Sequence, residues 1–153
     1  MAVIEEEAPV TEWLLIKRVI NSFNIWKAGS SIRTYMERIL SGMDLDKTLD
    51  DDAVIYWKVV QDPASYSLYR LFGRDELACR DALQVPAAEF ANAMLAVLKK
   101  QSVMTADELK RETAQLMGYT RMGSNVSDKV NQALKLNVKY KRIKISADSC
   151  ILR

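Results

Sequence analysis

The 153-residue sequence contains no histidine and only two cysteines, Cys79 and Cys150, which stand far apart. Neither cysteine belongs to a C-x-x-C pair, so the usual residues of a structural zinc site are missing. Without histidine, the chain also lacks the general base of Ser-His-Asp and Cys-His nucleophile systems. We therefore expect no metal site, no cofactor and no catalytic activity in this chain.

Long apolar runs are missing as well. None approaches the roughly 18 residues that a membrane-spanning helix needs. The first residues, MAVIEEEAPV, lack the basic start and the apolar stretch of a secretory signal. None of the five glycines stands in the G-x-x-x-x-G-K-[ST] spacing of a phosphate loop. We expect a cytoplasmic protein with no membrane partner, no small-molecule substrate and no ATPase activity of its own.

The charges that are present are distributed unevenly. The net charge is only +2, yet residues 1–53 carry a net charge of −4 and residues 98–153 carry +7. An excess of basic residues favours binding to a polyanion, although a solvated basic face with no ligand is about as common. Hydrophobic residues make up 49% of the chain, which is enough for the core of one ordinary domain or two very small ones.

An internal repeat relates the two ends of the chain. Residues 9–40 align without a gap to residues 103–134 when the sequence is shifted by 94 positions. The identities fall where helices start and turn, which is typical of a duplicated structural unit. The identical pairs are Thr11 and Thr105, Leu15 and Leu109, Gly29 and Gly123, Ser30 and Ser124, and Leu40 and Leu134.

Each copy of the repeat predicts two helices. The first starts after a threonine N-cap, Thr11 or Thr105, and Glu108 adds a capping box in the second copy. Gly118 and Asn24 stand where these helices should stop in a left-handed conformation. After a short link, Ser30 or Ser124 is expected to cap a second helix that runs to Leu40 or Leu134, and Phe23, like Leu15, is expected on the core face of the first copy.

After each helix pair the hydrophobic period changes from 3.6 to 2, which predicts hairpins. The first hairpin is expected to pair residues 53–60 with Tyr66–Phe72 around the QDPAS turn, and the second to pair YKRIKIS (residues 140–146) with SCILR (149–153). The acidic run DLDKTLDDD (44–52) lacks the spacing of a calcium loop and is expected to be a solvated loop, and residues 73–85 a linker.

An opening helix completes the pattern of a winged helix. PAAEFANAMLAVLKK (Pro86–Lys100) predicts this helix in the second copy. In the first copy the same helix would run from about eight residues before Met1 to Glu6, by the 94-residue offset. We expect an α+β, mostly helical chain of two tandem winged-helix modules, residues 1–83 and 84–153, and a segment of a longer protein.

The stretches EAPVTEWLLIKRV, KAGSSI and ELKRETAQLMGYTRMGS carry a family resemblance. They resemble the C-terminal segment of large bacterial superfamily-one helicase-like proteins, known as domain of unknown function 3320. The chain departs from that pattern at Asn24, where a glycine is expected. The resemblance covers nearly the whole chain and implies an accessory module of a parent protein that carries helicase motor domains and often a nuclease-like domain.

The residues at the two Gly-Ser turns are the candidate nucleic-acid contacts. A helix N-terminus presents free N–H groups and partial positive charge to a phosphate, and the second helix of a helix-turn-helix enters the major groove by that end. Simple capping of the helix by serine explains the same pattern equally well. The candidates are Lys27, Ser30, Ser31 and Arg33 in the first copy, and Arg121, Ser124, Asn125 and Lys129 in the second.

The second hairpin adds a basic wing. Lys139, Lys141, Arg142 and Lys144 surround Tyr140, and strand alternation would expose most of these lysines to a phosphate backbone. Edge strands also carry lysines that only prevent aggregation, so the two interpretations are balanced.

Among the aromatic residues, the tryptophans are candidates for base stacking, although a tryptophan in so small a domain is more often a core or interface residue. Trp57 lies in a predicted strand and is expected to be packed, whereas Trp26 is the tryptophan expected to be exposed.

Two functions are consistent with these features. The leading one is a non-catalytic accessory module that binds nucleic acid, with DNA expected, mostly through the second copy and its basic wing. The alternative is a protein-interaction module that docks the helicase or nuclease domains of the parent protein, and the acidic loop of the first copy favours this role there.

Overall fold

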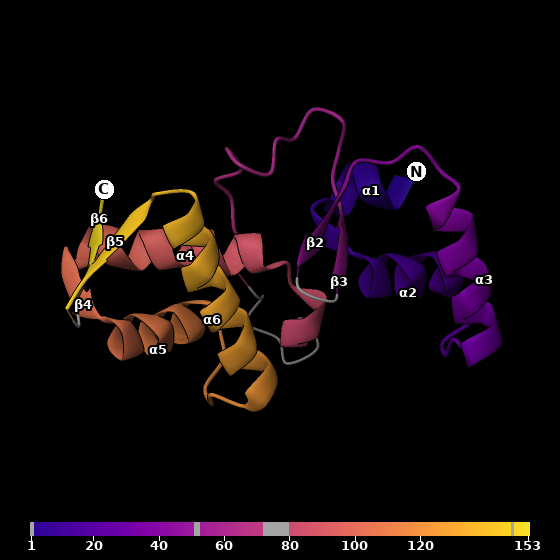
Figure 1. The fold of residues 1–153 in the computed structure, drawn as a ribbon. Coiled ribbons are helices and arrows are strands. Elements are labelled where there is room, and N and C mark those ends of the chain that lie inside the picture. Colours follow the sequence, from indigo (N-terminus) through magenta and orange to yellow (C-terminus); the bar gives the residue numbers. More distant parts are fainter. Residues whose placement is uncertain (1, 51–52, 72–79, 148) are drawn as a thin grey trace. The chain divides into compact units, whose positions relative to one another are not determined.

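The computed structural model describes residues 2–50, 53–71, 80–147 and 149–153, and divides into two compact units, Met1–Ser65 and Tyr66–Arg153 (Figure 1). Each unit has a hydrophobic core of its own. The sequence placed the boundary between residues 83 and 84, whereas in the structure residues 66–71 and 80–83 lie with the second unit.

Unit 1 combines three helices with a small antiparallel sheet. The sheet order is β1-β3-β2, so the first strand pairs with the last. The elements are α1 (Ala2–Glu7), β1 (Val10–Thr11), α2 (Glu12–Ser22), α3 (Ser30–Ser41), β2 (Lys47–Asp50) and β3 (Ala53–Tyr56).

Unit 2 repeats this order of elements behind a short 3-10 helix, η2 (Ala82–Gln84). Its antiparallel sheet has the order β4-β6-β5, which again pairs the first strand with the last. The elements are α4 (Ala87–Lys100), β4 (Val103–Thr105), α5 (Ala106–Leu116), α6 (Ser124–Lys139), β5 (Ile143–Ser146) and β6 (Ser149–Leu152). The fold is therefore α+β and mostly helical, as predicted.

The duplication is visible in the helix boundaries. Helices α2 and α5 begin 94 positions apart, and so do α3 and α6. The predicted opening helix of unit 2 is present as α4, with Pro86 at its N-cap. Helix α1 ends at Glu7, one residue beyond the predicted end of the corresponding helix in unit 1.

Threonine caps start the first helix of each pair. The Thr11 hydroxyl accepts a hydrogen bond from the backbone N–H of Leu14 at 3.3 Å. Thr105 and Glu108 form the predicted capping box, with reciprocal bonds of 3.2 and 3.0 Å. Hydrogen bonds from the backbone and side chain of Thr105 hold the pKa of Glu108 below its usual range.

Left-handed residues end the same two helices, as predicted. Gly118 has φ of 91° and Asn24 has φ of 59°. Glycine adopts this conformation at no steric cost, and asparagine tolerates it better than most other residues.

The two cores differ at the ends of these helices. In unit 2, Met117 is fully buried and lies at the position equivalent to Phe23. Phe23 was predicted on the core face but is 72% exposed. The prediction was wrong, and the helix end does not account for it, because Met117 is likewise the C-cap residue of its helix and is buried. Leu15 and Leu109 are buried at equivalent positions.

The predicted hairpin of the first copy was also wrong. Strand β3 pairs with Lys47–Asp50, within the run predicted as an acidic loop, rather than with a strand beyond the QDPAS turn. Residues 66–71 form no strand, and Phe72 lies outside the described residues. Of the predicted linker 73–85, residues 73–79 also lie outside them, and the rest includes η2.

Residues 66–71 are instead held on helix α4 by a buried carboxylate. Glu89 is fully buried, and both Arg70 and Arg80 contact its carboxylate, the latter at 3.2 Å. The Arg70 N–H donates to Glu89 Oε2 at 2.9 Å, and Asn92 Nδ2 donates to the Leu68 carbonyl at 2.9 Å. Burial alone would raise the pKa of Glu89, but hydrogen bonds and charge from Arg70 and Arg80 outweigh it and lower that pKa.

The second hairpin is present, but it starts later than predicted. Helix α6 continues to Lys139, and strand β5 begins only at Ile143. Lys141 lies in the turn between them with φ of 56°. Lys139 and Lys141 are therefore not strand residues, and the strand alternation that was expected to expose them does not apply.

Candidate nucleic-acid interface

The N-termini of α3 and α6 are capped differently from the prediction. The N-cap residues are Gly29 and Gly123, and Ser30 and Ser124 are the first helical residues. No side chain forms a cap hydrogen bond at either helix start, and neither first turn contains an acidic residue. Serine capping was therefore wrong, and both helix starts direct backbone N–H groups and partial positive charge outward.

Neither glycine is required by the backbone or by space. Gly29 and Gly123 both have φ of −66°, which any residue adopts. A Cβ atom at either position would meet no heavy atom within 4 Å. Steric constraints therefore do not explain why glycine occupies these two positions, where no side chain covers the helix start.

The four predicted contacts of unit 1 lie at the same end of α3. Lys27, Ser30, Ser31 and Arg33 are all exposed. The Arg33 Nε lies 2.7 Å from Glu37 Oε1 in an exposed pair one helical turn apart. Such surface pairs contribute only about 0.3–0.5 kcal/mol, so Arg33 can exchange this partner for a phosphate at small cost.

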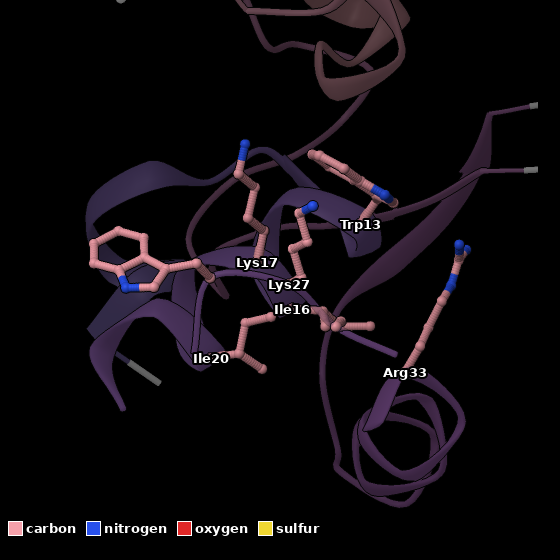
Figure 2. A pocket seen from close by; sticks show the side chains of 8 residues that line it. Trp13, Ile16, Lys17, Ile20, Lys27 and Arg33 are labelled. Atoms are coloured by element: carbon pink, nitrogen blue, oxygen red, sulfur yellow. The ribbon is translucent and has the colours of Figure 1, made fainter. Parts of the chain in front are cut away.

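Lys27 and Arg33 line a hollow of about 390 Å³ beside helix α2 (Figure 2). Two indoles, Trp13 and Trp26, line it together with the aliphatic part of α2. The complete lining is Trp13, Ile16, Lys17, Ile20, Trp26, Lys27, Ala28 and Arg33, which includes three cationic residues and no carboxylate.

A second, shallower depression lies along the outer face of α3. It is lined by Ser30, Ser31, Thr34, Tyr35 and Arg38. The Arg38 guanidinium lies 5.6 Å from the centre of the Tyr35 ring.

Sequence reasoning missed Thr34, Tyr35 and Arg38 of this face. Their spacing from Ser31, three, four and seven residues on, is the stripe that one helix face produces, so the signal was present.

The residues predicted at the start of α6 do not all lie on the surface. Arg121 and Ser124 are exposed and Asn125 is half-buried. Lys129 is only 3% exposed, so the prediction that it faces nucleic acid was wrong. It falls on the same stripe as Val126 and Val130, which places it against the core rather than toward solvent.

The other basic residues of unit 2 gather at the far end of α6. Lys139, Lys141 and Lys144 are exposed there. They are separated from Arg121 by the length of α6, about 22 Å at 1.5 Å per residue. The two predicted sets in unit 2 therefore form two sites rather than one.

Arg142 differs from these lysines because it is tied into the fold. Its Nη1 donates to Asn92 Oδ1 at 3.2 Å, and its backbone N–H donates to the Asn137 carbonyl at 2.8 Å. The guanidinium also lies 5.2 Å from the Tyr140 ring, on which Lys139 Nζ packs at 5.8 Å. Arg142 thus positions the turn that carries the lysines and is half-buried.

The predicted burial of Trp57 and the predicted exposure of Trp26 are confirmed. Trp57 is 4% exposed and donates its indole N–H to Thr48 Oγ1 at 2.9 Å. Trp26 is 74% exposed, and Trp13 is 43% exposed with the Lys17 ammonium 5.1 Å from its ring centre.

Within the described part of the chain, no group of three or more acidic, cysteine or histidine residues is placed to hold a metal ion. Cys150 is a buried free thiol, and burial raises its pKa. No helix among the described residues has the length and apolarity needed to span a bilayer.

Comparisons with known proteins add no relative: no protein-family model, no curated protein and no solved structure matches this chain.

Proposed function

We propose that the chain is a pair of winged-helix modules that bind nucleic acid, with DNA expected, as a non-catalytic accessory part of a helicase-like protein. The order helix, strand, helix, helix, strand, strand occurs in both units, with the first strand beside the last. A winged helix, in which a hairpin flanks a helix-turn-helix, would give this order of elements. The helicase-like context in this proposal is taken from the resemblance of the sequence to domain of unknown function 3320.

One observation carries the binding function: a segment of unit 2 with five basic residues and no acidic residue, which we call the basic surface. Residues 135–146 run from the exposed face of α6 through the turn into β5, with five basic and no acidic residues. Lys135, Lys139, Lys141 and Lys144 are exposed along it. Clustered cations that neutralise backbone phosphates release counterions, and this release drives binding regardless of base sequence.

A salt titration of the full chain tests this proposal. Binding of a labelled duplex is measured by fluorescence anisotropy at several salt concentrations, and the slope of log affinity against log salt is about −0.9 per phosphate contact. The double variant K139E/K141E should weaken binding and make that slope shallower by about 2. The variant K99E/K100E, at the end of α4, changes the net charge equally and serves as the control.

Two outcomes contradict the proposal. The first is that the wild-type chain binds no duplex even at low salt. The second is that the two double variants weaken binding equally, because binding would then follow net charge instead of this surface.

The alternative function, docking to another domain of the parent protein, is supported by exposed apolar residues of unit 1. Leu49 on β2 is 76% exposed, and Val59 and Val60, which follow β3, are 86% and 89% exposed. Co-purification of the chain with the separately expressed motor domains of a parent protein tests this role. A triple variant L49S/V59S/V60S should lose that association while it retains DNA binding.

A further inference from the structure

We infer that the hollow of unit 1 binds an unstacked base of single-stranded nucleic acid, with its phosphates held by the surrounding cations. This inference rests on the proposed nucleic-acid function. It assigns single-stranded nucleic acid as the ligand of unit 1, although the net negative charge of that unit disfavours binding of an anion. The hollow is shared by side chains of α2, the link to α3 and the first turn of α3 (Figure 2).

The surfaces of the hollow suit a planar apolar group. Ile16 and Ile20 contribute an apolar part of the lining, and each is only 4% exposed. The indoles of Trp13 and Trp26 add two aromatic surfaces that the fold leaves open to solvent. The volume of about 390 Å³ lies in the range of small-ligand pockets. Nucleobases stack on such rings regardless of sequence.

The charged side chains that line the hollow are all basic, so they favour binding of an anion. Lys17, Lys27 and Arg33 belong to the lining and no carboxylate does. The uncapped start of α3 lies beside them, because Lys27 and Arg33 flank the Gly29 N-cap. Unit 1 is acidic as a whole, so this concentration of cations beside two indoles is a local feature rather than a consequence of composition.

A single strand fits these features better than a duplex or a protein does. In a duplex both faces of each base are covered by neighbouring bases, whereas a single strand presents them for stacking on aromatic side chains. An aromatic peptide segment would match the indoles but would need several carboxylates of its own to match the cations.

The repeat provides an internal comparison. At the equivalent positions of unit 2, Trp13 is replaced by Asp107 and Trp26 by Thr120, whereas Lys27 is matched by Arg121. The cation is thus common to both units and the indoles belong to unit 1 only. Substituting Trp26 by the residue of unit 2 removes the stacking surface and leaves the charge in place.

The experiment compares binding of single-stranded and duplex DNA to the full chain. A labelled oligo-dT of about 12 nucleotides falls within the usual site size for such binding. Trp26→Thr should weaken its binding roughly 5- to 150-fold, which corresponds to about 1–3 kcal/mol for the loss of one stacked base. Trp26→Phe keeps an aromatic ring and should retain most of the affinity. Duplex binding should not change in either variant.

Two controls test the stacking itself. Phe23→Ala removes an aromatic side chain that is 72% exposed but does not line the hollow, so it should leave binding unchanged. An oligonucleotide of the same length with abasic sites retains every phosphate and should bind at least fivefold more weakly to the wild-type chain.

Several outcomes overturn the inference. These are equal binding of oligo-dT to wild type and Trp26→Thr, equal binding of the abasic and normal strands, or equally strong competition by an acidic copolymer of glutamate and tyrosine. The failure of the proposed basic surface is recognised separately, because K139E/K141E would then leave duplex binding intact while Trp26→Thr still weakens single-strand binding.

Discussion

Replacing Glu89 with glutamine tests the claim that a buried carboxylate fastens residues 66–71 to unit 2. The side chain of Glu89 is completely buried, whereas those of Arg70 and Arg80 are 35% and 16% exposed. Removing one partner of a buried ion pair costs about 3–5 kcal/mol, because the remaining charge is left in the interior. Arg70 can turn partly toward water, so we expect a loss of about 2–4 kcal/mol in the free energy of unfolding of unit 2.

The loss is large enough to measure in separate signals for the two units. For a unit of this size, 1 kcal/mol shifts Tm by about 4–8 °C, so Glu89→Gln should lower the Tm of unit 2 by roughly 10–30 °C. All three tryptophans lie in unit 1, so tryptophan emission reports that unit while circular dichroism reports both. Trypsin should also cleave after Arg70 and Arg80 faster in the variant, because their partner has gone.

The same variant has a defined pH dependence. The pKa of Glu89 is lowered in the folded chain from its ordinary value of 4.5. Its ionised form therefore stabilises the fold above about pH 4.5, and this contribution is lost as the pH falls through the folded pKa. The difference in stability between wild type and Glu89→Gln should shrink in that acid range. Glu112→Gln, on α5, makes the same chemical change as a control and should shift stability by less than about 0.5 kcal/mol.

The reasoning would be refuted by a Glu89→Gln protein whose circular-dichroism transition and tryptic cleavage match those of wild type. A variant difference that stays constant from neutral pH to pH 3 would refute the assigned ionisation even if stability falls.

Two further predictions concern helix ends. Thr105→Ala removes the reciprocal cap with Glu108 and should lower the free energy of unfolding, measured in urea, by about 1 kcal/mol. Thr105→Ser keeps the hydroxyl and should retain most of the stability. Equal losses in both variants would contradict a capping role. Gly118→Ala places a side chain at φ of 91° and should lower the free energy of unfolding of unit 2 by about 1 kcal/mol. Asn24→Gly, at φ of 59°, should leave unit 1 as stable or slightly more so, measured by tryptophan emission. Destabilisation by Asn24→Gly would show that the asparagine side chain has another role.

Local signals in the sequence predicted the helices well. Thr11, Thr105, Gly118 and Asn24 act at helix ends through their own side chains or backbone, so tertiary context changes them little. The offset of 94 residues then related one unit to the other and identified the helix pairs.

The first hairpin could not be predicted from the local pattern. The real strand β2 lacks the alternation of a strand, and residues 66–71 show alternation but form no strand. Strand β2 has an exposed Leu49 beside acidic residues, so it shows no apolar alternation. Tyr66–Leu71 does show alternation, but Tyr69 packs on the core of unit 2 and Arg70 reaches Glu89. That contact joins residues 19 positions apart, and no periodicity reveals it.

The candidate site in unit 2 was predicted only in part, because tertiary packing again decides which residues of α6 are buried. Lys129 was expected to face nucleic acid because it follows the start of the second helix, yet it lies with Val126 and Val130 on the buried stripe of α6. The predicted helix ran to Leu134, whereas α6 continues to Lys139 and includes Asn137. Asn137 is in fact buried, and its Nδ2 donates to the Ala91 carbonyl at 2.9 Å, which the sequence alone does not show.

The starts of α3 and α6 have no side-chain cap, and a cap that stabilised α3 would also interfere with the binding proposed at its start. Aspartate at Gly29 or Gly123 would fit without strain, since each position is open and has a backbone conformation that any residue adopts. It would accept the free N–H groups and complement the helix dipole, and so make the unit more stable. At Gly29 the same carboxylate would occupy the place that the proposed ligand's phosphate needs. At Gly29 the protein thus forgoes this stabilisation, which is the trade expected of a surface kept open for an anion.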